Sequence, residues 1–181
     1  DFMWGLHGVA KGTNPVEVKG SGGAGVSETA AVCGEISGEN HPFIEHFRFM
    51  KDLEDDSTIA KQTMPSPAQT LFLLQAGSAE NYPNPYSSDD ALSDALVGAY
   101  ARVLRDLYDA GCRVAQFDDC PWGMLVSADF KDSVFGRDPL AVQHQYAANN
   151  NAADRAAPKG LPTRPHRRRR PHHVPSVLYA G

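Results

Sequence analysis

Two adjacent carboxylates, Asp118 and Asp119, are the residues of this chain whose type and position best suit chemistry. They follow the short apolar run 112–117 and precede Pro121, which cannot continue a strand. In parallel α/β proteins the strand interior is apolar and covered, and polar groups at the carboxyl end face the opening where ligands bind. The sequence therefore predicts that Asp118 and Asp119 lie at the mouth of a ligand site.

The acidic pair has three chemical interpretations. Glycoside hydrolysis needs two acids that act across one bond, but consecutive strand residues point to opposite sides and no second acid is suitably placed. The residues alone leave two further interpretations equally open: the pair is solvated or caps the following helix, or the pair binds substrate. The elements that position Asp118 and Asp119 therefore have to be considered next.

The segment before the acidic pair predicts a helix followed by a buried strand. Capping and acidic residues at 87–90 start the helix, and apolar residues then recur at three- and four-residue spacing as far as Ala110. Gly111 is placed to end this helix of about six turns. The run from Cys112 to Phe117 is too short for another helix and suits a buried strand.

A second strand that ends in polar residues is predicted earlier in the chain. Residues 59–63 form this strand, which leads into Met64-Pro65-Ser66-Pro67 and a further helix. Residues 40–53 and 138–153 also predict helices, the first with an apolar stripe of Phe43, Ile44, Phe47 and Met50. The alternation of strands and helices predicts an α/β fold with parallel strands, either a barrel or an open sheet.

The glycine-rich segment 20–25 formally matches the dinucleotide-binding pattern GxGxxG. That motif requires a helix to open at the loop, and residues 26–30 do not indicate one. We therefore predict a flexible connection between two short strands, one at Val16–Val18 and one at Thr29–Cys33.

Composition and charge exclude several classes of protein. The 181 residues are 41% hydrophobic, enough for one ordinary core, and no segment is predicted to span a membrane. Six of the 17 basic residues lie in 159–181, a segment without any acidic residue. Residues 1–158 therefore have 11 basic and 22 acidic residues, a net charge of −11. Such an acidic body is a poor surface for nucleic acid. Three cysteines without paired spacing and a start unlike an export signal predict reduced thiols and a cytoplasmic setting.

Three separated motifs resemble a known family. Residues 59–67 (Ile-Ala-Lys-Gln-Thr-Met-Pro-Ser-Pro), 108–113 (Tyr-Asp-Ala-Gly-Cys-Arg) and 116–119 (Gln-Phe-Asp-Asp) are similar to the catalytic barrel of cobalamin-independent methionine synthase and its shorter single-barrel relatives. The likeness covers residues 1–157. It implies an α/β fold that is a partial (β/α)8 TIM barrel, without the N-terminal strand or strands and without the C-terminal half.

The resemblance implies a zinc-dependent homocysteine S-methyltransferase of methionine biosynthesis, similar to the 5-methyltetrahydropteroyltriglutamate–homocysteine enzyme. In that family a methyl group passes from a methylated folate to the sulfur of homocysteine. Zinc holds the sulfur as a thiolate near neutral pH, and carboxylates at the barrel mouth hold the ammonium group of the substrate. Asp118 matches the family's aspartate for this group, and Asp119 and Ser66 are further substrate-binding candidates. The implied partners are small molecules, with neither a membrane nor nucleic acid expected.

The chain also departs from the family pattern at both ends. The family's strand with a glycine–glutamate pair would precede Asp1, and the His-x-Cys pair of the zinc site is due soon after residue 153, yet no cysteine follows Cys120. We therefore expect residues 1–157 to be an incomplete barrel without metal ligands, inactive as this chain. Residues 158–181, rich in proline and arginine, are predicted to be disordered or translated out of frame.

Two other functions stay open at this point. The arginine run 167–170 suits a non-enzymatic protein with a basic nucleic-acid-binding tail, although no aromatic residues are interleaved with it. A barrel of the uroporphyrinogen-decarboxylase type would need no thiolate-binding zinc. The histidines His166, His172 and His173 suit a zinc site poorly, because no thiol or acid lies near them and the arginines repel a cation.

Overall fold

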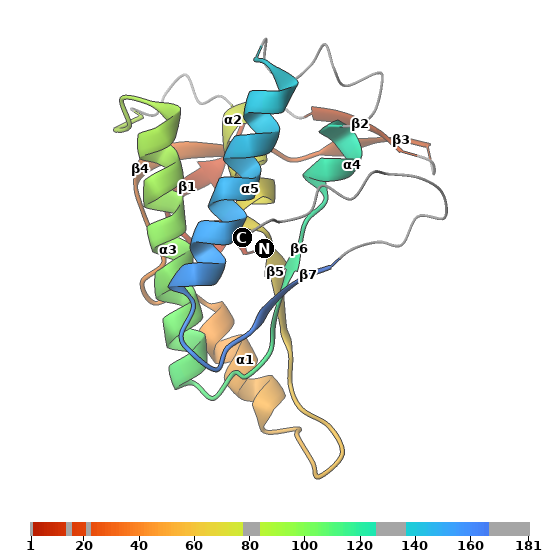
Figure 1. The fold of residues 1–181 in the computed structure, drawn as a ribbon, viewed down its shortest axis with the longest axis vertical. Helices are drawn as coiled ribbons and strands as arrows, with labels where there is room; N and C mark the ends of the chain where they lie inside the picture. Colours follow the sequence, from red (N-terminus) through yellow and green to blue (C-terminus); the bar gives the residue numbers. More distant parts are fainter. Residues whose placement is uncertain (1, 14–15, 21–22, 78–83, 126–136, 167–181) are drawn as a thin grey trace.

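The first part of the chain contains two antiparallel pairs of strands (Figure 1). β1 (His7–Lys11) follows a short 3-10 turn, η1 (Met3–Gly5), and pairs with β4 (Ala30–Ser37). β2 (Val16–Gly20) and β3 (Gly23–Ser27) pair with each other as a hairpin. Gly20 ends β2 and residues 23–25 lie in β3, so most of the segment predicted as a flexible connection belongs to the hairpin strands. The strand predicted at Thr29–Cys33 corresponds to β4, which begins at Ala30. The structure is a computed structural model that describes residues 2–13, 16–20, 23–77, 84–125 and 137–166.

Three parallel strands form the sheet that carries the acidic pair. They are β5 (Gln62–Pro65), β6 (Ala115–Asp118) and β7 (Thr163–His166), with β6 in the middle. The register places Pro65 beside Asp118, and Asp118 beside His166. The carboxyl ends of the three strands therefore lie at one edge of the sheet, which is where βαβ connections bring polar loop residues together.

Helices connect these parallel strands in the chain. The helices of the described residues are α1 (Phe43–Lys51), α2 (Pro67–Ala76), α3 (Asp89–Asp109), α4 (Pro121–Leu125) and α5 (Pro139–Ala156). The connection from β5 to β6 contains α2 and α3, and the connection from β6 to β7 contains α4 and α5. Figure 1 shows α2, α3 and α5 packed against one another beside the parallel strands.

α3 begins and ends where its local sequence predicts. The Ser88 hydroxyl accepts a hydrogen bond from the backbone N–H of Ala91 at 3.1 Å, and Asp89 and Asp90 occupy the first turn. The Ser88 hydroxyl satisfies a backbone N–H that has no partner within the helix, and the two carboxylates interact favourably with the positive end of the helix dipole. Gly111 follows the helix with a φ of 96°, a left-handed conformation that strains any residue with a Cβ.

The core lies between the helices and one face of the parallel sheet. Along β6, Ala115 and Phe117 are buried, whereas Gln116 and Asp118 are half-buried. The Phe117 ring contacts the Tyr100 ring of α3 edge-on, with 6.0 Å between the ring centroids. Because strand side chains alternate between faces, Gln116 and Asp118 lie on the face opposite the helices.

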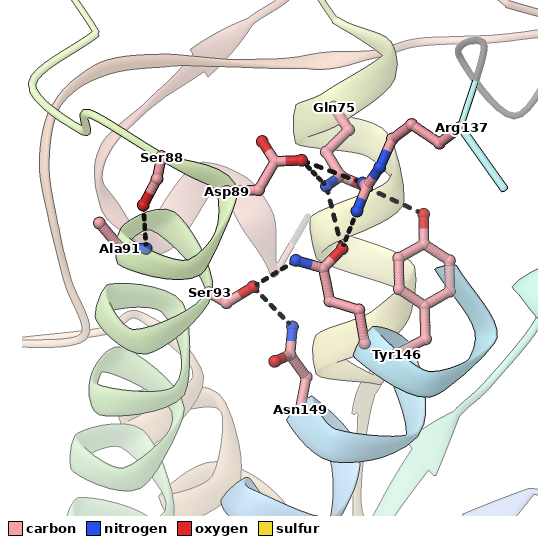
Figure 2. Close-up of polar contacts among 9 residues, drawn as sticks. Gln75, Ser88, Asp89, Ala91, Ser93, Arg137, Tyr146 and Asn149 are labelled. Carbon is pink, nitrogen blue, oxygen red and sulfur yellow. Dashed lines mark hydrogen bonds and ion pairs between the residues drawn. The ribbon is translucent and has the colours of Figure 1, made fainter. Parts of the chain in front are cut away.

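A polar network fixes the helices relative to one another (Figure 2). On α3, the Ser93 hydroxyl accepts hydrogen bonds from the amides of Gln145 and Asn149 on α5, each at 3.3 Å. Arg137, just before α5, forms an ion pair with Asp89 at the start of α3 at 3.0 Å. Polar groups between packed helices are stable only when they find such partners, so this network sets the position of α5.

Two of the predicted strands begin later than the sequence suggests. The strand expected from Ile59 begins at Gln62, and Ile59 itself is 67% exposed. The strand expected from Cys112 begins at Ala115, because the Cys112 N–H still bonds to a carbonyl of α3. In both cases apolar residues precede the point at which a neighbouring strand begins to pair, and pairing decides the boundary.

The remaining fold predictions have mixed outcomes. The α/β class is confirmed, but a partial (β/α)8 barrel is not shown, because β1 and β4 pair antiparallel in a sheet separate from β5–β7. In the segment 158–181, predicted to be disordered or out of frame, residues 158–166 include strand β7, and residues 167–181 lie outside the described residues. Met50, expected in the core-facing stripe of α1, is 49% exposed.

Candidate functional site

The three residues predicted to bind substrate lie together at the carboxyl edge of the parallel sheet. Asp118 is the last residue of β6 and Asp119 follows it, while Ser66 follows β5. The Ser66 N–H donates to the Asp118 carbonyl at 2.8 Å and so extends the strand pairing by one residue. The side chains of the two aspartates nevertheless have different surroundings.

The Asp119 carboxylate accepts hydrogen bonds from three side chains. Its Oδ1 accepts from the Ser66 hydroxyl at 2.7 Å, and its Oδ2 accepts from Trp122 Nε1 at 2.5 Å and from Asn150 Nδ2 at 2.9 Å. Charge-assisted bonds of this kind are stronger than bonds between neutral groups. Asp119 therefore holds the ends of β5 and β6 against α4 and α5.

The partners of Asp119 are themselves fixed by the backbone of α2. Ser66 is fully buried and is the N-cap of α2, where its hydroxyl accepts from the Gln69 N–H at 3.0 Å. Asn150 of α5 accepts from the Ala68 N–H at 3.0 Å through its Oδ1. Two otherwise unpaired donors of the first turn of α2 are thereby satisfied. The cluster of Asp119, Ser66 and Asn150 is consequently a structural junction of four elements.

A buried tyrosine supports the end of β5 from the other side. The Tyr100 hydroxyl lies 2.9 Å from the Pro65 carbonyl, 3.2 Å from the Ser66 carbonyl and 2.7 Å from the Thr70 hydroxyl. Burial raises the pKa of Tyr100 far above its ordinary value of 10. Tyr100 therefore stays neutral and acts as a fixed hydrogen-bonding group beneath the edge.

Asp118 has a different environment, on the face of the sheet opposite the helices. Its Oδ1 accepts a hydrogen bond from Gln116 Nε2 at 3.0 Å, and Gln116 Oε1 accepts from Lys61 Nζ at 2.7 Å. The Asp118 side chain is half-buried, so a small ligand can reach it while part of its hydration is already lost. A carboxylate in this position can bind a cationic group such as an ammonium.

The chain is similar to several known proteins. No family model matches the chain. It is 28% identical over 163 residues to the uncharacterized protein YxjG of Bacillus subtilis, and 26% identical over 159 residues to YxjH of the same organism. Among solved structures, a protein from Listeria monocytogenes, provisionally assigned as a vitamin-B12-independent methionine synthase, matches 91% of the chain with 31% identity and a TM-score of 0.70.

The chain resembles the vitamin-B12-independent methionine synthases. A methionine synthase of this type from Shewanella sp. W3-18-1, solved with selenomethionine, also matches 80% of the chain and 38% of its own length at 21% identity, with a TM-score of 0.49. The chain spans 42% and 41% of the lengths of YxjG and YxjH, and 44% of the Listeria protein. The chain therefore represents less than half of each of these three relatives, and the similarity to the Listeria protein confirms the resemblance predicted from the three motifs.

Zinc, which the resemblance to methionine synthases implies, has no binding site among the described residues. No group of three or more histidine, cysteine, aspartate or glutamate side chains lies close enough together there to hold a metal ion. His172 and His173 lie outside the described residues. Within the part of the chain that the structure describes, no helix is long and apolar enough to cross a membrane.

Several residues of the site were not identified from the sequence. Gln116 precedes Asp118 by two positions on a strand, and this spacing was a usable signal that the two side chains share a face. Asn150 and Tyr100 reach the site from helices that are distant in the chain, and nothing in the local sequence indicates their partners. Asp119 and Ser66 were predicted as substrate-binding candidates, and the hydrogen bond between their side chains was not predicted.

Proposed function

We propose that the carboxyl edge of β5–β7 binds the ammonium group of an amino-acid substrate, homocysteine, as part of a methyltransferase of methionine biosynthesis. The observation that carries this proposal is the position of Asp118, whose carboxylate lies at the end of β6 on the face opposite the helices. The resemblance to vitamin-B12-independent methionine synthases supplies the substrate class.

The different roles of the two aspartates follow from their partners. An ammonium group has three donors and needs an acceptor that is not already saturated. Asp118 has one side-chain donor in the described residues, Gln116, whereas Asp119 has three. We therefore assign the substrate contact to Asp118. Asp119 and Ser66 then hold in place the edge of the sheet that carries Asp118.

The methyl transfer itself requires groups that the described residues do not supply. In the family that the chain resembles, zinc would hold the homocysteine sulfur as a thiolate, and a methylated folate would supply the methyl group. The described residues do not form a set of zinc ligands, so no step through zinc is assigned to them. Their part in the reaction is to bind and orient the amino acid, which brings its sulfur to a defined place.

Binding measurements on the 181-residue chain test this proposal. Homocysteine and 4-mercaptobutanoate, which has the same thiol and carboxylate but no amino group, are titrated into the wild-type chain and into Asp118→Asn by NMR. We expect homocysteine to bind the wild-type chain more tightly than the des-amino compound, and Asp118→Asn to lose about 10-fold in affinity for homocysteine alone, as for a hydrogen bond between charged groups. Equal affinities in both proteins would contradict the proposal.

A further inference from the structure

Three side chains form a continuous line of hydrogen bonds on the face of the sheet opposite the helices. Lys61 Nζ donates to Gln116 Oε1 at 2.7 Å, and Gln116 Nε2 donates to Asp118 Oδ1 at 3.0 Å. Lys61 lies directly before β5, and the other two residues are in β6. Because Gln116 pairs with the neighbouring strand at Thr63, its backbone position is fixed by the sheet.

The chemistry of the two ends determines the orientation of the Gln116 amide. An ammonium group only donates hydrogen bonds, so the amide oxygen must face Lys61. A carboxylate only accepts, so the amide nitrogen must face Asp118. An inverted amide would place a donor against a donor and an acceptor against an acceptor. Lys61 therefore selects the one orientation in which Gln116 can donate to Asp118.

The hydrogen bond from Gln116 gives the two carboxylate oxygens of Asp118 different surroundings. Oδ1 accepts from Gln116, while Oδ2 forms no hydrogen bond with any residue that the structure describes. The bond also restrains rotation of the carboxylate, which would otherwise be free to turn on a half-buried side chain. A carboxylate held in this way presents its second oxygen in a constant direction and loses less entropy on binding.

We infer that Gln116 is a positioning residue, which orients the Asp118 carboxylate toward the ammonium group of an α-amino acid, and that Lys61 sets the orientation of Gln116. This inference rests on the proposed function, because it concerns the same carboxylate. It adds that recognition of the amino group depends on two residues that do not touch the ligand. The ligand class is an amino acid in its zwitterionic form.

The test uses Gln116→Met, which keeps the length of the side chain and removes both hydrogen bonds. We expect the affinity for homocysteine, measured by NMR titration, to fall about 3- to 10-fold, the effect of one modest hydrogen bond. The affinity for 4-mercaptobutanoate should stay within about twofold, because that compound has no ammonium group for Asp118. Lys61→Met should cause a smaller loss in the same direction.

Gln62→Met is the matched control. Like Gln116, Gln62 is a half-buried glutamine in a strand of the parallel sheet, at the start of β5. Its side-chain amide, however, donates to the backbone carbonyl of Thr63 at 2.9 Å. Gln62→Met should therefore leave the affinities for homocysteine and for 4-mercaptobutanoate unchanged. A general loosening of the sheet would lower the affinity for both ligands in Gln116→Met, and that result would overturn the positioning role.

The remaining outcomes separate the inference from the proposed function. If Asp118→Asn weakens homocysteine binding and Gln116→Met does not, the inference is wrong and the proposed function stands. If Asp118→Asn has no effect, both are wrong. A measurement without ligand gives an independent check: the side-chain amide resonances of Gln116 should shift in Asp118→Ala, and unchanged resonances would overturn the inference.

Discussion

Replacement of Asp119 by alanine should destabilise the fold far more than the same replacement of its neighbour Asp118. The change removes the acceptor of three donors, on Ser66, Trp122 and Asn150. Each buried donor left without a partner costs about 1–3 kcal/mol. The Ser66 hydroxyl can rotate and the half-buried Trp122 can reach water, so we expect a total loss of about 2–4 kcal/mol.

Urea unfolding followed by far-UV circular dichroism measures this loss. With a slope of about 2 kcal/mol/M, the midpoint for Asp119→Ala should fall by about 1–2 M. Asp118→Ala is the matched control: it loses one side-chain bond, to Gln116, and should change stability by less than about 1 kcal/mol. Asp119→Asn should fall between them, because the amide keeps one acceptor oxygen and can donate to Ser66. Equal midpoints for the two alanine variants would refute the structural role of Asp119.

Three further predictions concern the elements around the site. Ser66→Ala should lower the free energy of unfolding by about 2 kcal/mol, more than Ser88→Ala at an exposed cap, because Ser66 is buried and also bonds to Asp119; paired urea titrations compare the two. Burial lowers the pKa of His41 below its ordinary value of 6.5, so stability should be full above pH 6.5 and decline as the pH falls toward the lower value of the folded state. Thermal melts at pH 7.5 and 5.5 should show this decline in the wild-type chain and less of it in His41→Asn. Gly98→Ala should stabilise α3 by about 0.5–1 kcal/mol, since nothing lies within 4 Å of the added Cβ, whereas Gly111→Ala should destabilise by about 1 kcal/mol through its positive φ; opposite shifts in melting temperature are required.

The sequence predicts those parts of the fold whose signals are local. α3 was expected between residues 87 and 110 and spans Asp89–Asp109, because its cap, its acidic first turn and its closing glycine are all adjacent in the chain. The starts of β5 and β6 were less predictable. Strand boundaries depend on where a neighbouring strand begins to pair, and the apolar residues Ile59 and Cys112 carry no information about that partner.

The candidate site shows the same division between local and long-range information. The position of Asp118 and Asp119 at a strand end follows from the residues around them. The partner Asn150 does not, because it lies 31 residues after Asp119 and 82 residues after Ala68. Its place depends on how α5 packs, which in turn depends on the contacts of Ser93 and Arg137 between helices (Figure 2).

The alternation of side chains along a strand explains why two adjacent aspartates at one edge are not interchangeable. The chain turns out of the sheet after Asp118, so Asp119 faces α4 and α5 and becomes part of the core's polar junction, while Asp118 stays on the opposite face. A ligand that donated hydrogen bonds to Asp119 would have to displace donors that the fold itself needs. A ligand at Asp118 need only replace water. The proposed recognition at this edge therefore involves Asp118, the aspartate with fewer partners, whereas Asp119, the aspartate with more partners, holds the edge in place.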